Sequence, residues 1–153
     1  MTPPSVHDNL LISYEVHCEK RTISLRTEYR LKDKPTEFTN IIFEGVRAYH
    51  FQNDAFGNII FGVENVPAEW FLERYGAEIV ETNRMAGSPG EWVKDLDSAP
   101  AYLSEQEIQA FTLSSSLGLC GWVLAKKMLI VRIEPSDPSQ SSREAVEVDR
   151  PAR

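Results

Sequence analysis

The sequence has few cysteines and no long apolar run, and each shortage excludes a class of protein. No uninterrupted apolar stretch approaches the ~20 residues that a membrane-spanning helix needs. Residues 1–9 lack the basic start and apolar stretch of a secretory signal. Cys18 and Cys120 are too few for a disulfide framework or a zinc knuckle, and we expect both to be buried thiols. We therefore expect a soluble, cytoplasmic protein with no membrane partner.

Motifs for nucleotide binding, metal binding and covalent catalysis are also missing. Neither G-x-x-x-x-G-K-[ST] nor G-x-G-x-x-G occurs, and no G-x-S-x-G surrounds the serine run at 114–116. His17 and Cys18 are neighbours in a predicted strand, so their side chains should point to opposite faces. His7 and His17 lie at opposite ends of the first predicted strand, too far apart to share a metal ion. His17 and His50 could lie at the same end of the sheet, but a strand between them keeps their backbones about 10 Å apart, which is too far for a tight site unless the side chains converge. We expect no cofactor, no metal and no catalytic residue, which favours a protein that is not an enzyme.

Basic residues are scarce, and their distribution is uneven. The 153 residues include 16 Lys and Arg against 23 Asp and Glu, which gives a formal net charge of −7. A nucleic-acid-binding protein needs clustered basic residues to neutralise phosphates, so this class is excluded. The segment 64–107 contains ten acidic and three basic residues, so it carries the whole net charge while the remainder is neutral. Such asymmetry indicates where a basic partner would bind.

The composition is typical of one folded domain. Hydrophobic residues make up 42% and charged residues 25% of the chain, close to the average for globular proteins. A length of 153 residues fits one ordinary domain. Residues after Pro135 are rich in serine and proline and poor in apolar side chains. We predict a single domain over residues 1–134 and a disordered C-terminal tail over residues 135–153.

Alternating apolar residues predict β-strands in the first half of the chain. Leu10–Cys18 and Arg21–Leu31 have the period of two expected when one sheet face is buried, and they should form a hairpin. Phe38–Phe51 predicts a third strand, in which Gly45 marks a bulge or bend. Asn58–Val66 predicts a fourth strand. The short connections between these four strands favour an antiparallel meander.

The hydrophobic period changes at Pro67. Proline is favoured at the first turn of a helix, and from Ala68 to about Thr82 apolar residues recur at three- and four-residue steps. Ser104–Glu107 matches a capping box. It predicts a short second helix that carries Ile108 and Phe111.

The remaining segments complete the predicted fold. Gly87–Tyr102 contains glycine, serine and proline and predicts a loop. Trp122–Ile133 is too uniformly apolar for one amphipathic face and predicts a long strand or a tight hairpin. The fold class is therefore predicted to be α+β, with an antiparallel sheet of about five strands, one main helix packed on one face and a short second helix.

Trp70 is the strongest candidate for a binding residue. On a helical wheel it lies about 130° from the centre of the apolar stripe, beside Glu73 and Arg74. It is therefore either covered by the loop that bears Trp92 or exposed to solvent. An exposed tryptophan among acidic residues has the composition of a binding hot spot. We predict a partner-binding surface made of Trp70, Glu69, Glu73 and Arg74.

Three segments carry a resemblance to known proteins. Residues 43–51 (FEGVRAYHF), 58–61 (NIIF) and 113–122 (LSSSLGLCGW) resemble a family of small uncharacterised bacterial proteins. The small acidic antiparallel-sheet layout is loosely similar to immunity proteins of bacterial toxin systems, which neutralise a toxin by binding it. Charge and layout together favour a non-enzymatic interaction module that binds a basic protein through the 64–107 surface.

A small-ligand-binding domain or small hydrolase is the alternative prediction for the function. It would use the concave face of the sheet. A deep apolar cavity with convergent polar groups would favour this alternative, whereas an acidic surface with an exposed Trp70 would favour the interaction module.

Overall fold

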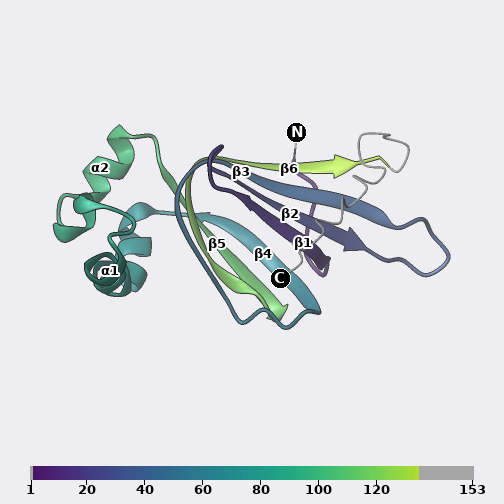
Figure 1. Cartoon of the computed structure of the whole chain (residues 1–153). Helices are drawn as coiled ribbons and strands as arrows, with labels where there is room; N and C mark the ends of the chain where they lie inside the picture. Colours follow the sequence, from purple (N-terminus) through teal and green to yellow (C-terminus); the bar gives the residue numbers. More distant parts are fainter. Residues whose placement is uncertain (1, 135–153) are drawn as a thin grey trace, which may run out of the picture.

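Six antiparallel strands close into a barrel in the computed structural model, which describes residues 2–134. Figure 1 shows the helices gathered beyond one end of this barrel. The predicted α+β class, antiparallel sheet and single main helix are confirmed, but the sheet has six strands rather than about five. The elements are β1 (Leu10–His17), β2 (Thr22–Tyr29), β3 (Glu37–Gln52), β4 (Asn58–Val66), α1 (Ala68–Ala86), the 3-10 helix η1 (Glu91–Lys94), α2 (Ala99–Glu105), β5 (Gln109–Leu117) and β6 (Cys120–Ile133).

The strand order is β1-β2-β3-β6-β5-β4, with β4 returning to β1. The first three strands are neighbours as predicted, but the four-strand meander is wrong because β4 pairs with β5 and β1 instead of β3. The free edge of β3 is taken by β6, which pairs along it from Phe38 to Gln52. The barrel closes where β1 pairs with β4 at Leu10 and Leu11. These strands are far apart in the sequence, so local sequence patterns do not predict that they pair.

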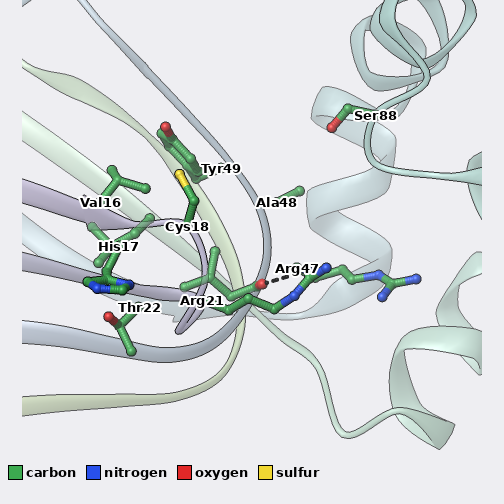
Figure 2. Close-up of a pocket in the computed structure, with 11 residues that line it drawn as sticks. Val16, His17, Cys18, Arg21, Thr22, Arg47, Ala48, Tyr49 and Ser88 are labelled. Carbon is green, nitrogen blue, oxygen red and sulfur yellow. Dashed lines mark hydrogen bonds between the residues drawn. The ribbon is translucent and has the colours of Figure 1, made fainter.

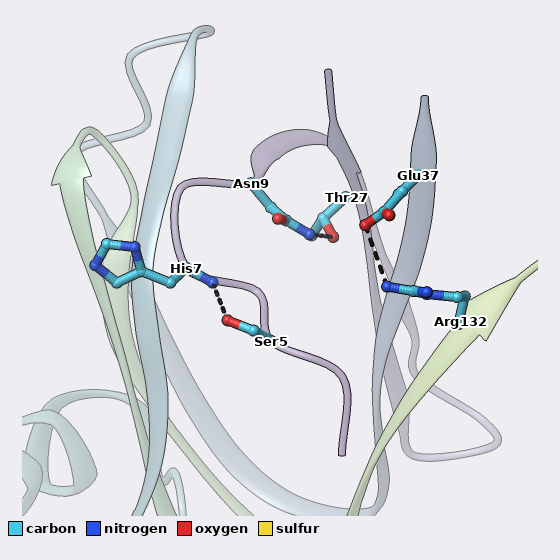
Figure 3. Close-up of polar contacts among 6 residues, drawn as sticks. All are labelled: Ser5, His7, Asn9, Thr27, Glu37 and Arg132. Carbon is cyan, nitrogen blue, oxygen red and sulfur yellow. Dashed lines mark hydrogen bonds and ion pairs between the residues drawn. The ribbon is translucent and has the colours of Figure 1, made fainter. Parts of the chain in front are cut away.

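Buried polar contacts link the residue before β1 to β2 and β3, and Figure 3 shows the first of them. The amide of Asn9 donates a hydrogen bond to Thr27 Oγ1 at 2.9 Å. That hydroxyl donates in turn to the carbonyl of Thr39 at 2.6 Å, and all three residues are buried. At the far end of β3 and β6, Arg132 pairs with Glu37 at 3.1 Å. Each buried polar group named here therefore has a partner, which offsets the cost of removing it from water.

Gly45 produces the predicted bulge in β3. Its φ is +63°, and the register against β6 shifts between Val46 and Ala48. A methyl group at Gly45 would lie 2.9 Å from the Cβ of Lys126, so the position requires glycine on two grounds. The irregularity breaks the side-chain alternation locally, so Val46 packs into the barrel core together with Ile41 and Phe43. Beyond it, Ala48 faces the helices and Phe51 again packs against the barrel core.

Two hydrophobic clusters hold the fold together. Alternate residues of β5 and β6 face opposite sides of the sheet, so one set fills the barrel and the other contacts the helices. The barrel cluster contains Val6, Leu11, Ile23, Leu25, Ile41, Phe43, Val46, Ile60, Phe111, Leu113, Leu119, Val123 and Ala125. The helix cluster contains Phe71, Leu72, Ile79, Val93, Ala99, Leu103, Ile108, Ala110, Trp122 and Leu124.

Helix α1 begins where the sequence predicts and ends later. Pro67 precedes its first residue, Ala68, and Gly87 ends it in the left-handed conformation with φ +71°. The Gly87 amide donates to the Asn83 carbonyl at 2.8 Å, which satisfies one of the free carbonyls of the last turn. The helix therefore runs one turn beyond Thr82. Within residues 2–134, no helix is long and apolar enough to cross a membrane.

The predictions for the segment after α1 need correction. The predicted loop over Gly87–Tyr102 contains η1 and the start of α2. The predicted second helix is misplaced, because α2 ends at Glu105 and Phe111 lies in β5. Glu107 has φ +57°, a conformation that cannot continue a helix. Pairing of β5 with strands on both sides overrides the capping pattern. The long strand predicted near the end is confirmed as β6, and the predicted tail over 135–153 lies outside the described residues.

Candidate functional site

A groove of about 520 Å³ lies between α1 and the outer face of the barrel. One wall is helical, and strands β3 to β6 form the floor. The floor is mostly small and polar, so the large side chains of the wall and rim give the groove its chemistry. These side chains include Trp70, Arg74 and Glu78 from α1 and His50, Glu64 and Trp122 from the strands.

Trp122 anchors α1 to the barrel beneath this groove. Its side chain is only 7% exposed. Its ring meets that of Phe71 edge-on at 5.3 Å between centroids and lies 6.5 Å from the ring of Tyr75. On the strand side, the imidazole of His50 stacks on Trp122 at 6.2 Å. This packing fixes the position of the helical wall relative to the floor.

Trp70 stands at the rim of the groove and is 44% exposed. Its ring contacts that of Tyr75 edge-on at 6.5 Å. The guanidinium carbon of Arg74 lies 5.6 Å from the centre of the Trp70 ring and 5.7 Å from that of Tyr75. Trp92 instead stacks on Tyr102 at 5.2 Å, so the loop that bears it does not shield Trp70. Of the two predicted environments, the exposed one is present.

The four predicted site residues divide into two pairs. Trp70 and Arg74 are four residues apart on α1 and share a face with Glu78, so all three line the groove. Glu69 and Glu73 are exposed on the neighbouring face of the helix and do not line it. The structure therefore brings the aromatic and the cationic residue together and leaves the two carboxylates in solvent.

The groove has two carboxylates, from Glu64 and Glu78, and one guanidinium, from Arg74. The Oε1 atom of Glu78 lies 4.0 Å from Nε2 of His50. Further along α1, Arg84 donates two hydrogen bonds to Glu81, at 2.6 and 3.1 Å, which lower the pKa of that carboxyl. The carboxylates of the groove have no such bidentate partner among the described residues. An incoming cation would therefore find them available.

Sequence reasoning missed the strand residues of the groove. His50 and Trp122 meet because they are register partners between β3 and β6. This pairing cannot be read from local periodicity, because it joins strands far apart in the sequence. Glu78 did leave a signal, because it lies eight residues after Trp70 and therefore on the same helical face.

A second pocket, of about 200 Å³, lies between the β1–β2 turn and the second half of β3. Figure 2 shows that His17 and Cys18 point in different directions there, and that Arg47 extends toward the helices. Arg47 donates to the hydroxyl of Tyr102 at 2.9 Å. The polar groups of this pocket therefore do not converge on one point. Cys18 is exposed in the turn and Cys120 is half-buried, so the prediction of two buried thiols is wrong.

A metal site and a ligand site on the concave face of the sheet are the two remaining possibilities in the described part of the chain. Within residues 2–134, no group of three or more His, Cys, Asp or Glu side chains is placed to hold a metal ion. The concave face of the sheet is the barrel interior, which core side chains fill. The groove of about 520 Å³ lies outside the barrel, on the helix side of the sheet.

Comparison with known proteins identifies no relative. No family model, curated protein or solved structure matches the chain. The resemblance to small bacterial proteins and to immunity proteins remains a prediction. The functional argument therefore rests on the geometry and charge of the groove.

Proposed function

We propose that this protein is a non-enzymatic interaction module that binds a basic protein through the surface centred on Trp70. The observation that carries the proposal is a tryptophan that is 44% exposed at the rim of a groove of about 520 Å³. Tryptophan is among the residues most enriched in binding hot spots, especially beside a pocket from which water can be excluded. The helical wall of the groove and Glu64 belong to the segment 64–107, which carries the whole net charge.

Preorganisation of the site supports this role. The Trp70 ring is held against Tyr75 and Arg74, so docking a partner immobilises little additional side-chain freedom. Burial of Phe71 and Trp122 fixes the helix that presents the ring. A rigid aromatic anchor loses less conformational entropy on binding than a flexible side chain does.

Charge supports a basic partner. The carboxylates of Glu69 and Glu73 face solvent beside the groove, and Glu64 and Glu78 line it. A negative potential concentrated on one side of the molecule steers a basic partner and raises its association rate. This steering should weaken as salt rises, because the screening length falls to ~8 Å at physiological ionic strength.

A small-ligand-binding domain or hydrolase that uses the concave face of the sheet is the alternative. It has less support, because core side chains occupy the barrel interior. The pocket beside the β1–β2 turn holds polar groups that point in different directions, which does not favour a hydrolase there.

The test is kinetic. A partner is captured by crosslinking to the full chain and purified, and its association is followed by surface plasmon resonance at low and high salt. We expect Trp70→Ala to weaken binding by ~2 kcal/mol or more, mainly through the off-rate. Reversing Glu69 and Glu73 to lysine should lower the on-rate. The matched control reverses Glu15 and Glu19, which are exposed on the barrel and its β1–β2 turn. Binding that ignores salt, Trp70→Ala and the Glu69/Glu73 reversal would refute the proposal.

A further inference from the structure

The groove already holds one cation against two aromatic rings. The Arg74 guanidinium lies within 5.7 Å of the ring centres of Trp70 and Tyr75, the range in which a cation is attracted by an aromatic face. Among the described residues, Arg74 has no carboxylate within ion-pair distance. Arg84 on the same helix, by contrast, is fixed by Glu81. Ring contacts at an exposed site contribute little, so Arg74 is displaceable.

The same groove carries two carboxylates that Arg74 does not neutralise. Glu64 approaches from β4 and Glu78 from α1, so they belong to opposite sides of the groove. Among the described residues, the one ion-pair contact to either carboxylate joins Oε1 of Glu78 to Nε2 of His50 at 4.0 Å. A second cation placed in the groove would gain both aromatic faces and both carboxylates, whereas Arg74 gains the aromatic faces alone.

We propose that the groove receives an arginine side chain of the partner, which displaces Arg74 from the face of Trp70 and pairs with Glu64 and Glu78. This inference rests on the proposed function and adds the chemical group that the partner must supply. Arginine fits better than lysine, because a planar guanidinium can stack on a ring and donate to carboxylates at the same time. In the absence of the partner, Arg74 occupies the position on the Trp70 ring that the partner's arginine would take.

The experiment uses L-arginine amide as the probe and the full chain as the receptor. The indole N–H signal of Trp70, assigned with Trp70→Phe, is followed by NMR during titration. We expect a saturable shift with arginine amide, a weaker one with lysine amide, and none with N-acetyl-L-glutamate. Glu64→Gln with Glu78→Gln should weaken arginine amide binding by about fivefold. The matched control, Glu15→Gln with Glu19→Gln, makes the same charge change on the barrel and should leave the affinity unchanged.

Arg74→Gln separates displacement from simple attraction. Removal of the competing guanidinium should tighten arginine amide binding by about threefold. If N-acetyl-L-glutamate shifts the Trp70 signal and Arg74→Gln abolishes that shift, the groove binds anions and the inference is overturned. Absence of any arginine-dependent shift overturns it as well. Partner binding that is lost in Trp70→Ala but unaffected by the Glu64/Glu78 pair would reject the arginine and leave the proposed function standing.

Discussion

The two tryptophans of the groove, Trp70 at its rim and Trp122 beneath it, should respond very differently to truncation. Trp70 is 44% exposed, and its described contacts are one aromatic pair and one cation over its ring. Such contacts contribute about 0.5–1.5 and about 0.5–1 kcal/mol, so Trp70→Ala should cost about 1–2 kcal/mol of folding stability. Trp122 is 7% exposed and packs on Phe71 and Tyr75. Trp122→Ala should therefore cost about 3–5 kcal/mol.

The free energies of unfolding can be compared by urea denaturation followed by far-ultraviolet circular dichroism, which does not depend on the tryptophan that is removed. Trp122→Phe is the control, because it keeps an aromatic ring in the core and should recover part of the loss. If Trp70→Ala destabilises the protein as much as Trp122→Ala does, Trp70 is a packing residue. The case for Trp70 as a docking residue would then fail, because substitution of a docking residue should weaken partner binding far more than it lowers the free energy of unfolding.

Three further outcomes follow from the barrel. Asn58 is buried, and its Oδ1 accepts hydrogen bonds from the backbone N–H groups of Leu119 and Ala55, at 2.8 and 2.9 Å. Asn58→Ala should therefore lower the free energy of unfolding by about 2–4 kcal/mol, measured by urea denaturation. An unchanged free energy would contradict this. Hydrogen bonds from Asn58, the Phe56 amide and Tyr14 lower the pKa of Asp54 below its usual 3.8. The stability that Asp54 contributes is therefore present above that value and is lost as pH falls through the folded pKa. When the free energy of unfolding is measured against pH, Asp54→Asn should make its decrease at acidic pH less steep. An unchanged slope would be evidence against this account. A Cβ at Gly121 would clash with the backbone oxygen of His50, so Gly121→Ala should cost about 3 kcal/mol or more. Calorimetry would detect this loss as a lower melting temperature, whereas native-like melting would show that the two strands can separate.

Local periodicity predicts those elements whose burial depends on their own sequence. The β1–β2 hairpin, the bulge at Gly45 and the start of α1 at Ala68 follow from alternation, a backbone requirement and a proline. Strand β5 and the closure of the barrel do not, because they depend on pairing with strands far away in the chain. The capping pattern at Ser104–Glu107 shows the conflict directly, since tertiary pairing prevails there over a local helix signal.

The candidate site divides in the same way. Trp70 and Arg74 are predictable because four-residue spacing places them on one helical face. His50 and Trp122 become part of the groove only when β3 and β6 pair in the observed register. The floor of the site is thus a product of the barrel topology, while its wall is a product of the helix sequence.

The helical layer is a single excursion of the chain from the barrel. Val66 at the end of β4 is the register partner of Ala110 near the start of β5, so the chain leaves the sheet and returns to it at adjacent positions. Everything between them can be regarded as a cassette inserted into a hairpin. Such a cassette can change its surface residues and its charge without altering the strand order, provided that it still presents an apolar stripe to Trp122 and Leu124. The surface of the helical layer is thus free to vary independently of the strand pairing that builds the barrel.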